Sequence, residues 1–163
     1  MMSDSSIALY FRHMFEYEEC ANRQIVSFLS TNTVPSEVVT IFGHLIADMQ
    51  PWVYLMNGHG VPENIDCSPQ WSLEECRSHL QSSTEVLRAI VMELEDADFS
   101  KSITSYAPNG RMFQNTVSEI LTQILSHGQH HRGQIEWIVE REMGQYLATS
   151  YMPFLRQRSL SQK

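Results

Sequence analysis

Two histidines four residues apart, His127 and His131, are the residues of this chain whose type and spacing best suit metal chemistry. They lie in a segment with the pattern of one long helix, where positions i and i+4 share a face and their Cβ atoms are roughly 5–6 Å apart. Neutral imidazole is the commonest protein ligand for ions such as zinc, nickel and iron. Two such rings on one helix face can therefore bind a single metal ion.

The apolar residues around the pair indicate which way this face points. A 4-3-4-3 spacing, typical of a helix packed into a bundle, runs through Val117, Leu121, Ile124, Gly128, His131, Ile135 and Ile138. His127 lies only about 40° from His131 around the helix axis, whereas His130 is about 100° away. We therefore expect the first two rings to point inward. Buried imidazoles need partners, either a metal or hydrogen bonds to neighbouring groups.

A third candidate ligand, His44, lies within the apolar and helix-like stretch 38–48. The histidines His13, His59 and His79 lie in polar or turn-like segments, so we expect them on the surface. Three histidines from two helices would form an open metal site, with a remaining position for water or substrate. We therefore predict that His44, His127 and His131 bind one metal ion.

Two further polar residues are candidates for the surroundings of this site. Asp48 lies one turn after His44 and can orient an imidazole ring or bind the ion as a further ligand. Gln134 follows the histidine pair and is expected to serve packing and hydrogen bonds between helices. Gly128 lies near the ligand face, where it can leave room for metal or substrate, and Gly133 can allow another helix to approach closely. The sequence identifies no general base, so we assign no catalytic residue.

The elements that must position these residues are four long helices. We expect them at residues 5–30, 36–56, 72–94 and 115–142, with a short helix at 152–157. Residues 101–115 alternate weakly around the turn signal Pro108-Asn109-Gly110, which predicts a small β-hairpin. Pro51 falls inside the second run, where it should bend or end the helix. The pattern predicts an all-α, four-helix-bundle fold with a hairpin between helices 3 and 4, as one domain over residues 1–163.

The motif residues resemble those of the DinB-like (damage-inducible, YfiT-like) family over nearly the whole chain. The signature H-x-x-x-H-R-G-Q is present at residues 127–134, and His44, Asp48 and Trp52 are similar to the second helix of the family. Residues 15–23 resemble its first helix. The resemblance implies a four-helix bundle, commonly a homodimer, with a divalent metal held by the three histidines. Better-understood relatives transfer or isomerise groups using low-molecular-weight thiols such as bacillithiol or mycothiol.

We therefore expect a divalent-metal-dependent enzyme that acts on a small molecule by transfer or isomerisation with a low-molecular-weight thiol. Zinc, nickel and iron all suit a three-histidine site. A metal-activated hydrolase is the alternative enzyme, although no Glu follows His127, so the chain lacks the H-E-x-x-H protease motif. A non-enzymatic metal-binding or small-molecule-binding module is the third possibility.

The composition limits which partners the chain can bind and indicates its cellular compartment. With 11 basic residues against 19 acidic and a net charge of −8, the chain is poorly suited to nucleic acid or an anionic membrane surface. No apolar run approaches the roughly 20 residues of a membrane span, and no secretory signal is visible. Three cysteines without a CxxC pair are expected to be reduced thiols, so we expect a cytoplasmic protein. A homodimer is also expected from large side chains near helix ends, namely Trp52, Tyr54, Leu55, Trp137, Tyr146 and Tyr151.

Overall fold

The computed structural model describes residues 6–107 and 109–161. Its element order is α1 (Ile7–Thr31), α2 (Ser36–Met56), α3 (Leu73–Glu93), the 3-10 helix η1 (Asp96–Ser100), β1 (Ser102–Tyr106), β2 (Met112–Thr116), α4 (Val117–Met143) and α5 (Tyr151–Ser161). The predicted mostly helical fold with a hairpin between the third and fourth helices is confirmed. Pro108, the first residue of the predicted turn signal, lies outside the described residues.

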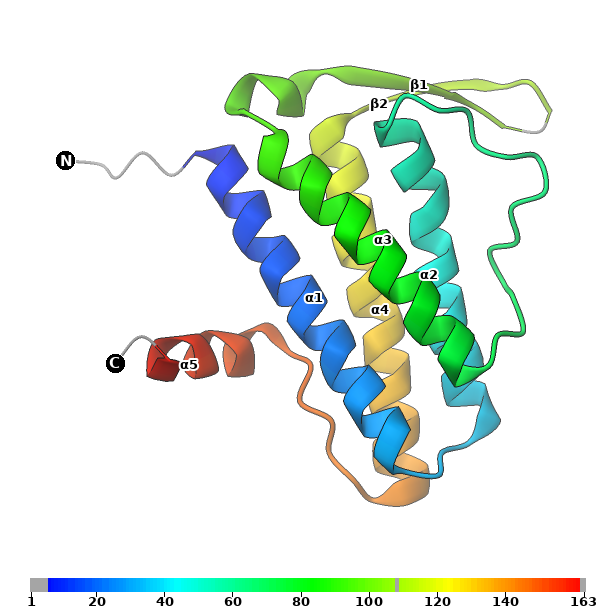
Figure 1. Cartoon of the computed structure of the whole chain (residues 1–163), viewed down its shortest axis with the longest axis vertical. Helices are drawn as coiled ribbons and strands as arrows, with labels where there is room; N and C mark the ends of the chain where they lie inside the picture. The colour runs from blue at the N-terminus through cyan, green and yellow to red at the C-terminus, as the bar shows by residue number, and fades with distance from the viewer. Residues whose placement is uncertain (1–5, 108, 162–163) are drawn as a thin grey trace.

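The helices α1 to α4 form the bundle (Figure 1). Helix α2 packs against α3 and α4, and α1 packs against the other sides of the same two helices. The interior is filled by apolar side chains from all four helices, because each helix turns one apolar face inward. The most deeply buried of these include Ile25, Val38, Phe42, Leu45, Ile46, Val91, Ile120, Leu121, Ile135 and Val139.

The ends of the helices follow local sequence signals. The side chains of Ser72 and Thr116 each accept a hydrogen bond from the backbone N–H three residues later, at Glu75 and Glu119. The side chains of these two glutamates accept in turn from the backbone N–H of Ser72 and Thr116, which completes a capping box at each helix start. Helix α4 ends at Gly144, whose φ of 62° is the left-handed conformation that glycine adopts without steric cost. These signals fix where α3 and α4 begin and where α4 ends.

The expectation that Pro51 would bend or end its helix differs from the structure in one respect. Helix α2 continues through Pro51 to Met56 and does not end there. The proline lies within the last two turns, so the single backbone hydrogen bond that it removes is close to the end of the helix.

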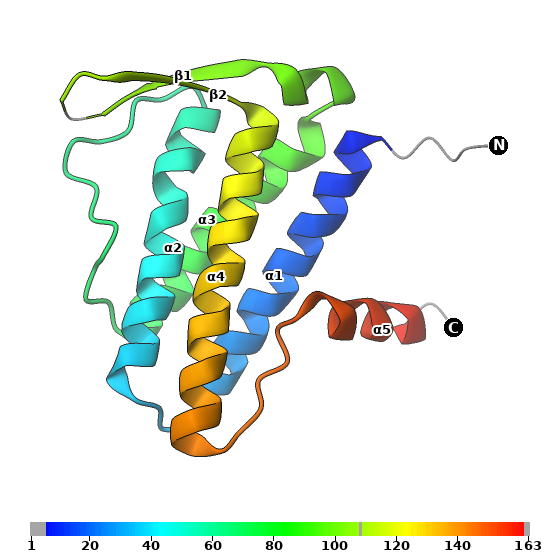
Figure 2. The ribbon, with the colours of Figure 1, turned by 180° about the vertical axis from the view of Figure 1, so that it is seen from behind.

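The hairpin and α5 are additions to the bundle. Strands β1 and β2 are antiparallel, with Ser102 opposite Thr116 and Tyr106 opposite Met112, and they lie across one end of the bundle (Figures 1 and 2). Helix α5 contacts α1 and projects from the side of the bundle (Figure 2). Among residues 6–107 and 109–161, no helix combines the length and apolar character that crossing a membrane requires.

Candidate metal centre

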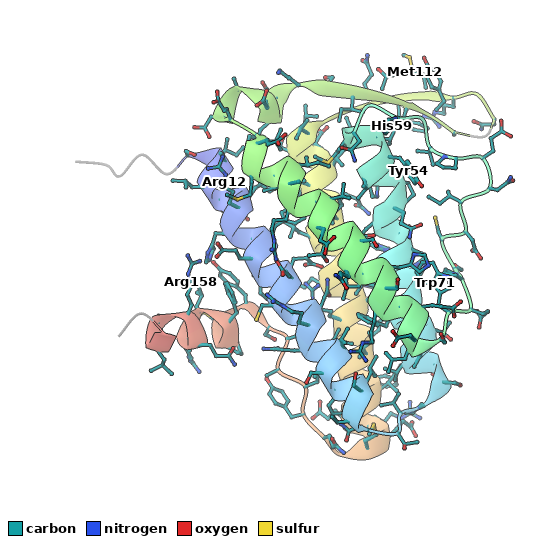
Figure 3. All side chains as sticks on the ribbon, viewed as in Figure 1. Arg12, Tyr54, His59, Trp71, Met112 and Arg158 are labelled. Carbon is teal, nitrogen blue, oxygen red and sulfur yellow. The ribbon has the colours of Figure 1, made fainter. Side chains whose placement is uncertain are left out.

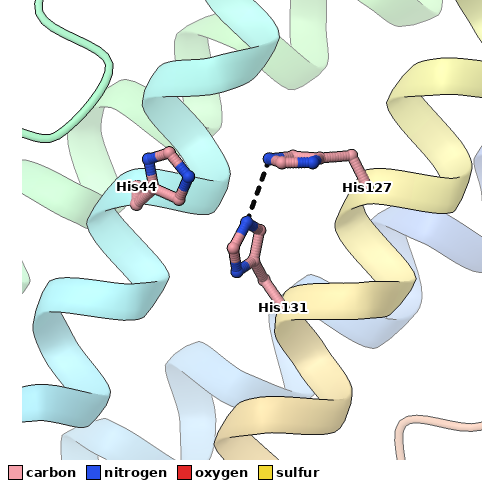
Figure 4. A group of neighbouring side chains, drawn as sticks. All are labelled: His44, His127 and His131. Atoms are coloured by element: carbon pink, nitrogen blue, oxygen red, sulfur yellow. Dashed lines mark hydrogen bonds between the residues drawn. The ribbon is translucent and has the colours of Figure 1, made fainter.

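The three predicted ligand residues lie together in the structure. His44 comes from α2, and His127 and His131 come from successive turns of α4, which packs against α2. One ligand atom from each of the three rings lies within 4.8 Å of the other two. Figure 4 shows the rings facing a common point, with one nitrogen of His44 turned toward the two histidines of α4. This arrangement could hold a metal ion.

Hydrogen bonds at Nδ1 fix the orientation of two of these rings. His131 Nδ1 is 2.6 Å from Gln134 Oε1, and His44 Nδ1 donates to the backbone carbonyl of Cys67. A neutral imidazole with its proton on Nδ1 presents Nε2 as a lone-pair donor. The Nε2 atoms of His131 and His127 are 3.0 Å apart (dashed line in Figure 4). The donor set therefore fits a divalent cation bound through Nε2 atoms.

The charge state of His131 also suits a ligand. The side chain is 8% exposed, and this burial lowers its pKa below the usual value for histidine. The hydrogen bond that His131 donates to Gln134 opposes this effect, while the neighbouring imidazoles of His127 and His44 add to it. The ring is therefore neutral at pH 7, and the neutral form is the one that binds metal.

Both polar neighbours predicted from the sequence lie beside the histidines. Asp48 Oδ2 is 3.1 Å from His127 Nε2, so this carboxylate lies at the edge of the centre. Gln134 accepts from His131 and so holds that ring in position. Ligating histidines commonly donate their second ring nitrogen to such an acceptor, which raises the basicity of the ligating nitrogen.

The loop between α2 and α3 contributes contacts that the sequence did not predict. The Cys67 carbonyl accepts from His44 Nδ1, and Ser68 Oγ lies 3.5 Å from the same atom. Burial, followed by the charge of Asp48, raises the pKa of the Cys67 thiol, so this thiol is protonated at neutral pH. No motif in residues 57–72 signals these contacts, because they depend on the path of an irregular loop.

Behind the centre, α4 is held against α1 by a buried ion pair. Arg132, which follows His131, is 1% exposed, and its Nη1 atom is 2.5 Å from Glu18 Oε1 and 3.1 Å from Asn22 Oδ1. Arg132 therefore points away from the histidine cluster while His131 points into it. Arg132 thus joins α4 to α1 by hydrogen bonds.

The predictions for the two glycines of α4 were wrong. A Cβ on Gly128 would come within 3.0 Å of Glu18 Oε1, so this glycine makes room for the buried ion pair and not for metal or substrate. A Cβ on Gly133 would meet nothing within 4 Å, so no helix approaches closely there. His13, His59 and His79 were all expected on the surface. His59 is exposed, but His13 and His79 are partly buried.

The sequence of the chain is similar to one protein family and to a curated protein. The model of the DinB family matches residues 2–159 of the chain. Protein DinB of Bacillus subtilis (strain 168) is 22% identical over 149 residues, which cover 82% of this chain and 84% of that protein. No solved structure matches the chain significantly.

Proposed function

The chain belongs to the DinB family, and we propose that it is a divalent-metal-dependent enzyme in which the thiol of a small molecule acts as the nucleophile. The observation that carries this proposal is the convergence of three imidazoles, two of them with an acceptor at Nδ1. A structural zinc site is usually closed by four protein ligands, whereas a three-histidine site leaves a position for substrate. This favours catalysis over a purely structural ion.

Zinc, nickel or iron bound by His44, His127 and His131 would supply Lewis acidity that lowers the pKa of a coordinated thiol. Other residues of the chain would orient the ligating rings and accept the proton of the thiol. Gln134 and the Cys67 carbonyl keep two rings in the ligating orientation. Asp48, whose Oδ2 atom is 3.1 Å from His127 Nε2, would accept the proton that the thiol releases.

A thiol-transfer assay tests the proposal. Mercaptoethanol attacks chlorodinitrobenzene by forming a sulfur–carbon bond with the aromatic ring, while chloride leaves and the thiol proton is released. We expect metal-loaded protein to accelerate this reaction at least about tenfold at pH 7, because almost all of the free thiol is protonated at that pH and the thiolate is the nucleophile. The metal-free protein and the His131→Ala protein should lack the acceleration.

The same assay separates the alternatives. Metal-dependent hydrolysis of nitrophenyl acetate without any thiol requirement would instead support the metal-activated hydrolase, in which water is the nucleophile. Metal bound at the cluster with no acceleration of either reaction would leave a metal-binding module and overturn the enzymatic proposal.

A further inference from the structure

A groove on the outer face of α2 and α4 adjoins the histidine cluster. Its volume is about 440 Å³, and its lining includes Glu37 and Ile41 from α2 and Gly133, Gln134 and Trp137 from α4. Gln134 belongs to both features, because it lines the groove and its Oε1 atom is 2.6 Å from His131 Nδ1. Ile41 also lies one turn before His44 on α2, as Gln134 lies one turn after His131 on α4, so the groove continues from the cluster along the two helices.

Gly133 keeps this groove open. A glycine within a helix costs about 1 kcal/mol relative to alanine, so it needs a reason. Gly128 has such a reason in the buried Glu18 carboxylate, but an added Cβ on Gly133 meets no atom within 4 Å. The space above Gly133 is part of the groove, and any larger side chain at this position would fill it.

The groove has apolar and polar walls: Ile41, Trp137 and Ile138 are apolar, His130 and Gln134 are polar, and Glu37 is the one carboxylate among the described lining residues. Ile41 is partly buried, and the Trp137 side chain is 58% exposed although it is a large indole. Among the described lining residues there is no Lys or Arg, and Glu37 carries the negative charge. The nearby Arg141 lies over the Trp137 ring at 4.8 Å and is paired with Glu142 at 3.2 Å, so its charge is compensated.

Helix geometry sets the length of a molecule that would span this groove. Glu37 and His44 are seven residues apart on α2, which corresponds to about 10 Å along the helix axis. An extended chain of eight carbon atoms has about this length. A second hollow of about 290 Å³ lies between α1 and α3, but none of the three histidines lines it. None of the three histidines lines the groove between α2 and α4 either, but Gln134, which accepts a hydrogen bond from His131, does line it.

We infer that the groove binds the tail of the substrate, and that this tail is an apolar chain about 10 Å long ending in a cationic amine that pairs with Glu37. The inference rests on the proposed function, since the thiol of the same molecule occupies the open position at the three histidines. Ile41 and Trp137 contact the apolar chain, and Gly133 gives it room. The preferred substrate class is thus a long aminothiol.

Thiols of matched length test this inference on the cobalt-loaded protein, where coordination of a thiol gives a charge-transfer absorption band. The probes are aminooctanethiol, mercaptooctanol and mercaptooctanoic acid, together with mercaptoethanol as a short control. We expect aminooctanethiol to bind at least about tenfold tighter than mercaptoethanol, because its chain buries apolar surface in the groove. The carboxylate-ended thiol should bind most weakly of the three long probes.

Two variants test whether the tail of the thiol binds in the groove. Gly133→Leu should weaken binding of all three long thiols about tenfold or more and leave mercaptoethanol unchanged, because leucine fills the groove and is a good helix former. Glu37→Gln should remove the preference for the amine, about fivefold, without affecting mercaptooctanol. Melting temperatures of both variants verify that they are folded.

The outcomes distinguish the inference from the function on which it rests. If mercaptoethanol binds normally but chain length and terminal charge make no difference, the groove assignment is wrong and the proposed function stands. A preference for the carboxylate-ended thiol, or wild-type affinity in Gly133→Leu, overturns the assignment as well. If no thiol of either length binds the metal-loaded protein, both proposals fail.

Discussion

At the scale of single residues, the candidate centre depends on which ring nitrogen of each histidine carries the proton. Gln134 and the Cys67 carbonyl both act at Nδ1, on His131 and His44, so the lone pairs of both rings are left at Nε2. Burial keeps His131 neutral by lowering its pKa. Without such contacts, the rings would have to be reoriented and deprotonated when metal binds, which would weaken binding.

Metal binding to the folded state should raise the melting temperature. Zinc at about a hundred times its dissociation constant stabilises the native state by about 2.7 kcal/mol, which corresponds to a rise of roughly 5–10 °C for a chain of this size. His131→Ala should abolish the rise, because two histidines from different helices bind an ion only weakly. Differential scanning fluorimetry with and without zinc measures the effect.

His130→Ala is the matched control for this prediction. Its ring lies 5.0 Å from that of His131, but it does not belong to the group of three converging ligands. We expect this variant to keep the full metal-induced rise. A rise that persists in His131→Ala, or disappears in His130→Ala, would place the ion elsewhere.

Much of this centre could be predicted from residue spacing. The inward phase of His127 and His131 followed from the apolar stripe of their helix, and His44 stood out because it interrupts an apolar run. The contact of Asp48 with His127 was not predictable in detail, because it depends on how α2 and α4 are rotated against each other. The contact between His44 and the Cys67 carbonyl depends on a loop that has no periodic signal.

At the scale of elements, the two glycines of α4 have opposite surroundings although they are five residues apart. Gly128 faces α1, where the Glu18 carboxylate is held by Arg132 at 2.5 Å. Gly133 faces outward, where a Cβ would meet no atom within 4 Å. The sequence alone could not distinguish them, because the distinction depends on which neighbouring side chain fills the space over each glycine.

Alanine substitutions should therefore have opposite effects on the free energy of unfolding. Gly133→Ala should stabilise the protein by up to about 1 kcal/mol, the difference in helix propensity. Gly128→Ala should destabilise it, because the new methyl group displaces Glu18 from its buried partner Arg132, and losing such a pair costs up to about 3–5 kcal/mol. Urea unfolding followed by circular dichroism measures both values. Equal effects of the two substitutions would contradict the assigned role of Gly128.

Helix boundaries were the part of the fold that local sequence signals predicted best. Ser72 with Glu75 and Gly144 act where their capping patterns indicate. Pro51 does not end α2, although a proline was expected to bend or end the helix. The free-energy cost of a proline depends on its place in the helix, and α2 has only five residues after Pro51. The fold as a whole follows from four apolar stripes of similar length, which can only be buried against one another.

At the scale of the whole molecule, α5 lies outside the four-helix bundle and contacts α1. It is joined to α1 by the contact of Tyr151 with His13 at 2.7 Å and by the ion pair of Arg158 with Glu16 at 2.8 Å. Figure 3 shows Arg158 on the side of α5 that faces α1. Met152 and Leu160 are exposed on the same helix, at 55% and 74%. Exposed apolar side chains on a projecting helix are a plausible contact for a partner.

We expect the chain to form a homodimer through this region, away from the groove and the histidine cluster. Tyr146, at 77% exposed, precedes α5 and adds aromatic surface, and aromatic residues are enriched in the cores of interfaces. A stable interface of this kind buries about 1,200–2,000 Å² in total. Sedimentation equilibrium at micromolar concentration should therefore give twice the chain mass of 18.8 kDa.

A matched pair of substitutions locates the interface. Met152 on α5 and Met112 on β2 are both 55% exposed, so replacing either by glutamate introduces the same charge at equal exposure. Met152→Glu should shift the protein to monomer, because burying an unpaired carboxylate in an interface is unfavourable. Met112→Glu should remain dimeric, since the hairpin lies across one end of the bundle (Figure 1). A wild-type mass near 18.8 kDa would show that the dimer does not form, and dissociation by Met112→Glu alone would place the interface on the hairpin.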